Sequence, residues 1–247
     1  MADLVPDLGF DAGAAPGGTL LACSAATVDH TQRVVVGAFV KTIRSAQHHL
    51  EVRDVPVDHL LADTQAPCPR VAVPIALTGH GEEMAAIELA RSLDPELLVA
   101  PALGPDWVLA EVCVRRLIDA RVHQLDTIVL GVEGSDDSDA LADYSRAAQL
   151  VSAVWGGPVH LGSLSGRDVS LGDAIDVARA YGRRVVVASY VLTPGPAHEQ
   201  LRRSGADVVT APLLDGATPD PRLVQLVLER FRQATDRQMH GNPRLLL

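Results

Sequence analysis

The sequence contains few aromatic residues: Phe, Trp and Tyr make up 3% of its 247 residues. Nearly half of the chain, 47%, is nevertheless hydrophobic, so its core must be built from Ala, Val and Leu. This composition is common in α/β proteins, whose parallel strands are Val- and Leu-rich because both faces of the sheet are buried. A chain of this length can form one large α/β domain or two lobes of ordinary size.

Cysteines and long apolar runs are also scarce. Cys23, Cys68 and Cys113 are odd in number and far apart, which argues against a disulfide framework and favours a reducing compartment. No apolar run approaches the roughly 20 residues that span a bilayer. Residues 1–18 carry Asp rather than Lys or Arg, unlike a secretory signal. We therefore expect a cytoplasmic protein with no membrane partner.

Positive charge is in deficit as well. The chain has 21 Lys and Arg against 31 Asp and Glu, a formal net charge of −10, and no stretch gathers basic residues with aromatics. Nucleic acid is therefore excluded as an expected partner. The loop after the first strand lacks the glycines of a phosphate cradle, so it does not match a Rossmann or P-loop motif. Small ligands, metal ions and proteins remain.

Short Val- and Leu-rich runs alternate with helical patterns along the chain. The predicted strands are 18–23, 49–55, 70–77, 97–100, 127–132, 158–161, 183–191 and 207–211. The predicted helices are 30–47, 83–92, 106–120, 139–155, 170–181, 196–204 and 221–234. Repeated strand-helix units of this kind indicate parallel sheets.

The two halves of the chain resemble each other. Residues 70–117 align with 184–231 almost without gaps, and the turn residues match as well as the strands. Ala- and Val-rich βα repeats all look alike, but the matching turns favour an internal duplication. We predict two doubly wound lobes, 19–122 and 123–234, each a roughly four-stranded parallel sheet flanked by helices. A flexible lead, 1–18, would precede them and a tail, 235–247, would follow.

The loops after the strands are the candidate site, because ligands in such folds bind outside the carboxyl ends of the strands and between lobes. The loop TGHGEE brings His80, Glu82 and Glu83 within four residues. Its imidazole and carboxylates could hold a divalent ion or relay protons. Alternatively, the loop is a solvated turn whose carboxylates complement a helix dipole.

Three further features have two interpretations each. Cys23 is either a nucleophile or metal ligand paired with a histidine, or a small buried hydrophobe. The acidic run GVEGSDDSD either lines the site or caps a helix through Ser138 or Asp139. By duplication, His198 falls opposite Glu83, near the same end of the molecule, although a single histidine at a helix start is usually just exposed.

The pattern as a whole resembles the sirohydrochlorin chelatases, class II chelatases of the cobalamin and sirohaem pathways. The resemblance covers roughly residues 19–231 and rests on the duplicated lobe and on LLVAPALGPDWVLAEV, TIVLGVEGSDDSDA, RRVVVASYVLTPGPAHEQLRRSGADVVTAPL and LVQLVLERF. It implies two α/β lobes that hold a tetrapyrrole in the cleft between them. A histidine would bind the incoming Co²⁺, Fe²⁺ or Ni²⁺ and help to take up the pyrrole protons, and insertion would need no nucleotide cofactor. Because the duplication lies within one chain, we expect either a monomer or a homodimer.

The family's histidines are not in register here. Its first strand normally ends in Ala-His-Gly-Ser, where this chain has ACSA at 22–25, and its second histidine aligns with Glu82. A rebuilt site would use His80 and Glu82 as catalytic residues and bind the metal through Cys23, His80, Glu82 and His198. Alternatively, the chain binds a tetrapyrrole, a metal or a protein partner without turnover. A regulatory or scaffold protein is a third interpretation.

A macrocycle in this cleft would touch the loops that follow the strands of both lobes. The residues predicted to contact it are Ser24, Gly134, Ser135, Pro194 and Gly195.

Overall fold

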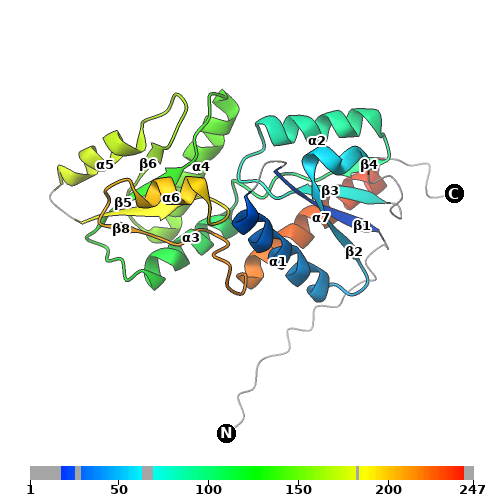
Figure 1. Ribbon diagram of the computed structural model, residues 1–247, viewed down its shortest axis with the longest axis horizontal. Coiled ribbons are helices and arrows are strands. Elements are labelled where there is room, and N and C mark those ends of the chain that lie inside the picture. The colour runs from blue at the N-terminus through cyan, green and yellow to red at the C-terminus, as the bar shows by residue number, and fades with distance from the viewer. Residues whose placement is uncertain (1–17, 26–28, 63–68, 182–183, 242–247) are drawn as a thin grey trace, which may run out of the picture.

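The computed structural model describes residues 18–25, 29–62, 69–181 and 184–241 (Figure 1). These residues form two lobes, each built on a four-stranded parallel sheet flanked by helices. The predicted α/β fold class is therefore confirmed. No helix in the described ranges is long and apolar enough to cross a membrane. The predicted lead, apart from Gly18, lies outside them, as does Cys68.

The first lobe has its sheet in the order β2-β1-β3-β4. Its elements are β1 (Thr19–Ser24), α1 (His30–Ala46), β2 (Glu51–Pro56), the 3₁₀ helix η1 (Val57–Ala62), β3 (Arg70–Pro74), α2 (Glu82–Leu93) and β4 (Leu97–Val99). The sequence did not predict η1. Every residue of the central strands β1 and β3 is buried, as both faces of this sheet are covered.

The second lobe repeats this connectivity, with the sheet order β6-β5-β7-β8. Its elements are β5 (Thr127–Val132), α4 (Ser138–Trp155), β6 (Val159–Ser163), α5 (Leu171–Arg179), β7 (Val185–Ser189), α6 (Pro196–Arg202) and β8 (Val208–Val209). The two halves share one strand order, which supports the predicted duplication. The acidic run before α4 caps that helix, but the N-cap is Asp137 rather than Ser138 or Asp139, with backbone N–H groups donating to its carboxylate.

The two lobes exchange a helix. Helix α3 (Trp107–Asp119) follows β4 in the chain but packs on α4 and β7 of the second lobe. Helix α7 (Pro221–Gly241) follows β8 but packs on β3, β4 and α1 of the first lobe. Figure 1 shows α7 among the elements of the first lobe. The predicted boundaries at 122 and 234 divide the chain by sequence. In the structure, each lobe also includes a helix from the other half of the sequence.

Helix α7 also extends into the segment predicted as a tail. It remains helical to Gly241, and Ala234 and Thr235 are buried against the rest of the fold. One hydrophobic cluster runs through both lobes, from Leu20 and Phe39 to Leu130 and Tyr190. The lobes therefore share a single connected core in addition to the smaller clusters on their outer faces.

Arg230 of α7 binds the segment in which the chain crosses from β4 to α3. Its guanidinium donates to the carbonyls of Ala102 at 3.0 Å and Leu103 at 3.2 Å. It also lies 2.7 Å from the carboxylate of Asp106, whose other oxygen caps α3. The side chain of Arg230 is only 11% exposed, so these partners replace most of its hydration.

Arg116 of α3 makes the corresponding contacts with the return crossing from β8 to α7. It donates to the carbonyl of Leu213 at 3.2 Å and pairs with Asp215 at 2.9 Å. Arg116 and Arg230 occupy equivalent positions in the aligned halves, 70–117 and 184–231. Helix α3 therefore binds the segment that leads into α7, and α7 binds the segment that leads into α3.

Loss of either arginine should destabilise the whole fold. Arg230→Ala leaves Asp106 and two carbonyls without their partner, so we expect the free energy of unfolding to fall by about 3 kcal/mol. The matched control is Arg115→Ala, which removes an exposed pair with Asp119 and should cost less than about 0.5 kcal/mol. Chemical denaturation measures both, and equal losses would contradict the role given to Arg230.

Candidate functional site

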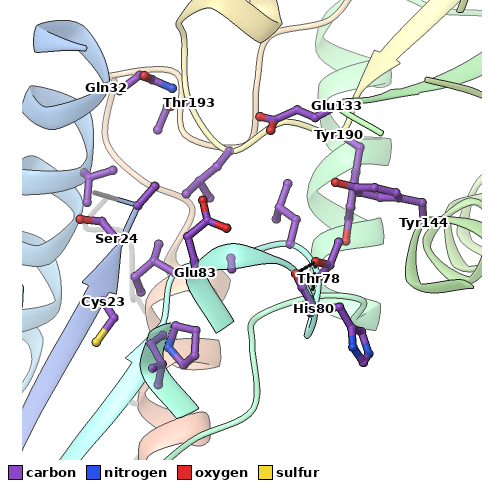
Figure 2. A pocket seen from close by; sticks show the side chains of 18 residues that line it. Cys23, Ser24, Gln32, Thr78, His80, Glu83, Glu133, Tyr144, Tyr190 and Thr193 are labelled. Carbon is purple, nitrogen blue, oxygen red and sulfur yellow. Dashed lines mark hydrogen bonds between the residues drawn. The ribbon is translucent and has the colours of Figure 1, made fainter. Parts of the chain in front are cut away.

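A cavity of about 170 Å³ lies between the lobes, where the loops after β1, β3, β5 and β7 meet (Figure 2). Both lobes contribute to its walls. Among the lining residues are Ser24, Gln32, Val36, Ile75, Leu77, Thr78, His80 and Glu83 from the first lobe and Glu133, Tyr144, Tyr190, Leu192 and Thr193 from the second. This is the position predicted for a ligand in a doubly wound fold, at the carboxyl ends of the strands.

Close backbone packing sets one wall of the cavity. Gly104, in the crossing segment, lies so near the loop after β3 that an added Cβ would come 2.3 Å from the carbonyl oxygen of Leu77. The same Cβ would lie 2.7 Å from the hydroxyl of Tyr190. Only glycine fits here, and its small size lets the crossing segment, the first lobe and Tyr190 of the second lobe meet.

Two carboxylates from opposite lobes face the cavity. Glu83 is the second residue of α2 and Glu133 follows β5, and Figure 2 shows both carboxylates turned into the space between the lobes. Loss of hydration between the cleft walls raises the pKa of Glu133, and the charge of Glu83 raises it further. Much of the Glu133 surface can still be reached by water, so the cleft is narrow rather than closed.

Two tyrosines complete the second-lobe side. Tyr190 is 1% exposed, and its hydroxyl has no hydrogen-bond partner within the described structure. Tyr144, from α4, lies beside it (Figure 2). Burial is the main cause that raises the pKa of both phenols, so both remain protonated at neutral pH. The cavity thus offers neutral hydroxyls beside the two carboxylates.

The predicted catalytic residue His80 lines the cavity but faces away from Glu83 (Figure 2). Its Nε2 lies 4.0 Å from a carboxylate oxygen of Asp143, on α4 of the second lobe. The same oxygen accepts a hydrogen bond from the backbone N–H of Gly79 at 2.8 Å. Asp143 therefore joins the His80 loop to the second lobe at the rim of the cavity.

Glu82, the other predicted catalytic residue, is exposed and does not line the cavity. Its neighbour Glu83 does, because successive helical residues point about 100° apart. His198 lies on α6, where its Nε2 is 3.0 Å from the carbonyl oxygen of Thr210. A carbonyl can only accept, so this nitrogen keeps its proton and is not a metal ligand in this arrangement.

Cys23 is among the residues that line the cavity, but its side chain also belongs to the core of the first lobe. Its side chain is 2% exposed and packs among Leu21, Ile87 and Ala90, on the sheet face covered by α2. Its thiol donates to the carbonyl of Leu21 at 3.4 Å. Burial, together with the charge of Asp54, raises the pKa of Cys23 to about 12. Of the two interpretations of Cys23, the small buried hydrophobe agrees with this environment.

Of the four predicted metal ligands, Cys23 and His80 line the cavity, whereas Glu82 and His198 do not. Within the described ranges, no group of three or more His, Cys, Asp or Glu side chains is placed to hold a metal ion. The predicted ligand set therefore stays a prediction. The described structure does not bring together Cys23, His80, Glu82 and His198.

Of the predicted macrocycle contacts, Ser24 lines the cavity, while Gly134, Ser135, Pro194 and Gly195 do not. Gly134 has φ +89°, and a Cβ there would come 2.0 Å from the carbonyl of Ser165, so it serves loop packing. Gly195 lies against the side chain of Gln32, a cavity residue of the first lobe. The loop of Gly195 therefore helps to join the lobes.

Sequence reasoning included Glu133 only as part of the acidic run GVEGSDDSD and assigned no site role to Tyr144 or Tyr190. Tyr190 carried a signal, because it is one of three tyrosines in the chain and directly follows a buried strand. Glu133 likewise follows β5 directly. Tyr144 lies inside a helix, where nothing in the local pattern separates a cavity residue from a core residue.

The thiol of Cys23 should resist alkylation. At pH 8 a thiol with a pKa near 12 is thiolate to about one part in ten thousand, so iodoacetamide should react roughly a thousandfold more slowly than with an ordinary cysteine. Mass spectrometry of the native chain measures this, with the chain in guanidinium as the control. Equal rates in the two states would show that Cys23 is accessible.

Glu133→Gln should stabilise the protein at neutral pH. The folded-state pKa of Glu133 is raised above its ordinary value of 4.5, so its ionisation weakens folding as the pH rises through that value. The substitution should raise Tm at pH 7 and leave it unchanged near pH 3.5, where Glu133 is protonated in both states. Asp176→Asn, an exposed change on α5, is the control. If Glu133→Gln raised Tm equally at low pH, the cause would be packing rather than the loss of a charge.

Solved structures of chelatases share this fold. SirB from Bacillus subtilis with Fe³⁺ superposes with a TM-score of 0.67 at 14% identity, covering 91% of this chain and 97% of that chain. SirB from Bacillus subtilis subspecies spizizenii in complex with cobalt gives 0.66 at 15% identity, covering 90% and 96%.

CbiX, the terminal enzyme of sirohaem biosynthesis in denitrifying bacteria, gives a TM-score of 0.64 at 15% identity, covering 88% of this chain and 99% of that chain. No protein-family model and no curated protein matches the sequence. The chain therefore has a chelatase-like fold, shared over nearly its whole length with class II chelatases.

Proposed function

We propose that this chain uses the chelatase fold to bind a ligand between its two lobes without inserting a metal ion. The observation that carries the proposal is the environment of Cys23, at the strand end where the family resemblance places a metal-binding histidine. The side chain of Cys23 is 2% exposed, packs in the core of the first lobe and donates its thiol hydrogen to the carbonyl of Leu21, so the sulfur is engaged within the lobe.

The contacts between the lobes support a site that closes around its ligand. Asp143 holds Gly79 across the rim of the cavity, and Gly195 lies against Gln32 on another side. We propose a ligand smaller than a tetrapyrrole for this cavity of about 170 Å³. A smaller ligand could be enclosed with the lobes as they stand.

Metal insertion is the second candidate: Co²⁺ or Fe²⁺ would enter a sirohydrochlorin-type tetrapyrrole in cobalamin or sirohaem biosynthesis. The observation that favours it is the pair Glu83 and Glu133. A carboxylate with a raised pKa is a better proton acceptor near neutral pH, and the pyrrole nitrogens must lose two protons. His80 and Glu82 would then bind the metal at the rim. Both candidates place the protein in the cytoplasm, as a monomer or a homodimer.

Anaerobic metal insertion separates the two candidates. With sirohydrochlorin and Co²⁺, the absorption change of insertion should be no faster with the protein than without it. An acceleration that Glu133→Gln lowers at least tenfold, with Glu229→Gln as the exposed control, would establish the second candidate instead. Quenching of sirohydrochlorin fluorescence in the same samples reports binding without turnover.

A further inference from the structure

We propose that the cavity between the lobes binds a compact organic cation, an ammonium group with an apolar substituent. This inference rests on the proposed function, because it names the class of ligand held there. It differs from the expectation of a tetrapyrrole, whose acetate and propionate side chains make it a polyanion.

The charge of the lining selects a cation. Glu83 and Glu133 project into the cavity from opposite lobes, and no Lys or Arg is among its described lining residues. The remaining ionisable nitrogen, on His80, has Asp143 as its neighbour. A positive group between Glu83 and Glu133 would relieve their mutual repulsion, while an anionic ligand would add to it.

The buried hydroxyl of Tyr190 gives an independent indication of a missing partner. It lines the cavity, is 1% exposed and makes no hydrogen bond in the part of the chain that the structure describes. A buried polar group without a partner is costly, and an ammonium N–H could donate to this oxygen. The ring of Tyr144, beside it, could attract the same cation through its face.

The rest of the wall suits an apolar substituent. Val36, Ile75, Leu77 and Leu192 supply hydrophobic surface, so the cavity combines apolar walls with a few polar groups, as small-molecule sites do. Its volume of about 170 Å³ is enough for several water molecules. An amine with a single ring is the size of ligand that we propose for it.

A bare divalent metal ion suits the cavity less well. Such ions take four to eight nitrogen, oxygen or sulfur ligands, and the described residues hold no group of three or more suitable side chains placed for an ion. Apolar walls cannot replace the ligands or water molecules that the ion would lose.

A series of probes that differ only in charge tests the proposal on the unmodified protein. Benzylammonium, benzyl alcohol and benzoate have nearly the same shape. Saturation-transfer NMR and titration should show saturable binding of benzylammonium, at least tenfold tighter than benzoate, with benzyl alcohol between them. Equal or reversed affinities would overturn the inference, and so would binding of Co²⁺ at the cavity without binding of benzylammonium.

Variants of the lining residues test whether benzylammonium binds in this cavity. The double variant Glu83→Gln, Glu133→Gln should bind benzylammonium at least tenfold more weakly. Its affinity for benzyl alcohol should be unchanged. Tyr190→Phe keeps the ring and should weaken benzylammonium alone. The matched control is Glu88→Gln, an exposed carboxylate on the same helix as Glu83, paired with Arg91. Unchanged affinity in both cavity variants would overturn the inference.

Sirohydrochlorin distinguishes failure of this inference from failure of the proposed function. If the macrocycle occupies the cavity, removal of the two carboxylates should strengthen its binding, the opposite of the effect on a cation. Tighter sirohydrochlorin binding by the double variant would overturn the cation inference and leave the proposed function standing. Absence of binding for every probe and for sirohydrochlorin would overturn both.

Discussion

The exchange of α3 and α7 between the lobes is the constraint on which the rest of the structure depends. Arg116 of α3 binds the segment that leads into α7, and Arg230 of α7 binds the segment that leads into α3. The positions of the two exchanged helices therefore depend on each other. The connected core passes through the same junction. This arrangement fixes the two sheets so that the carboxyl ends of their central strands open onto one cavity.

The cavity owes its charge to this geometry. Each lobe contributes one of the two carboxylates that line the cavity, and Glu83 and Glu133 interact only across the cleft. Their repulsion works against the contacts that join the lobes, such as that of Asp143 with Gly79. The cleft therefore combines opposing interactions, and a ligand that neutralises the carboxylates would favour the joined arrangement of the lobes.

The sequence predicted the strands and helices well, because hydrophobic periodicity and turn residues are local signals. It predicted the site less well, because side-chain direction depends on tertiary packing. Cys23 and Ser24 are neighbours, but alternation along β1 turns the thiol to the face covered by α2. Glu82 and Glu83 are separated by one helical step, and only Glu83 reaches the cavity. The helix exchange has no local signal, since α7 has the same apolar periodicity whichever sheet it covers.

Helix α7 also imposes an order on biosynthesis. The strands of the first lobe leave the ribosome early, yet the helix that covers β3 and β4 follows all the other described elements. During translation the apolar face under α7 must stay exposed while the whole second lobe is made. The half of the molecule that is synthesised first is therefore completed last, and its unfinished sheet is the surface that a nascent chain of this protein offers to chaperones.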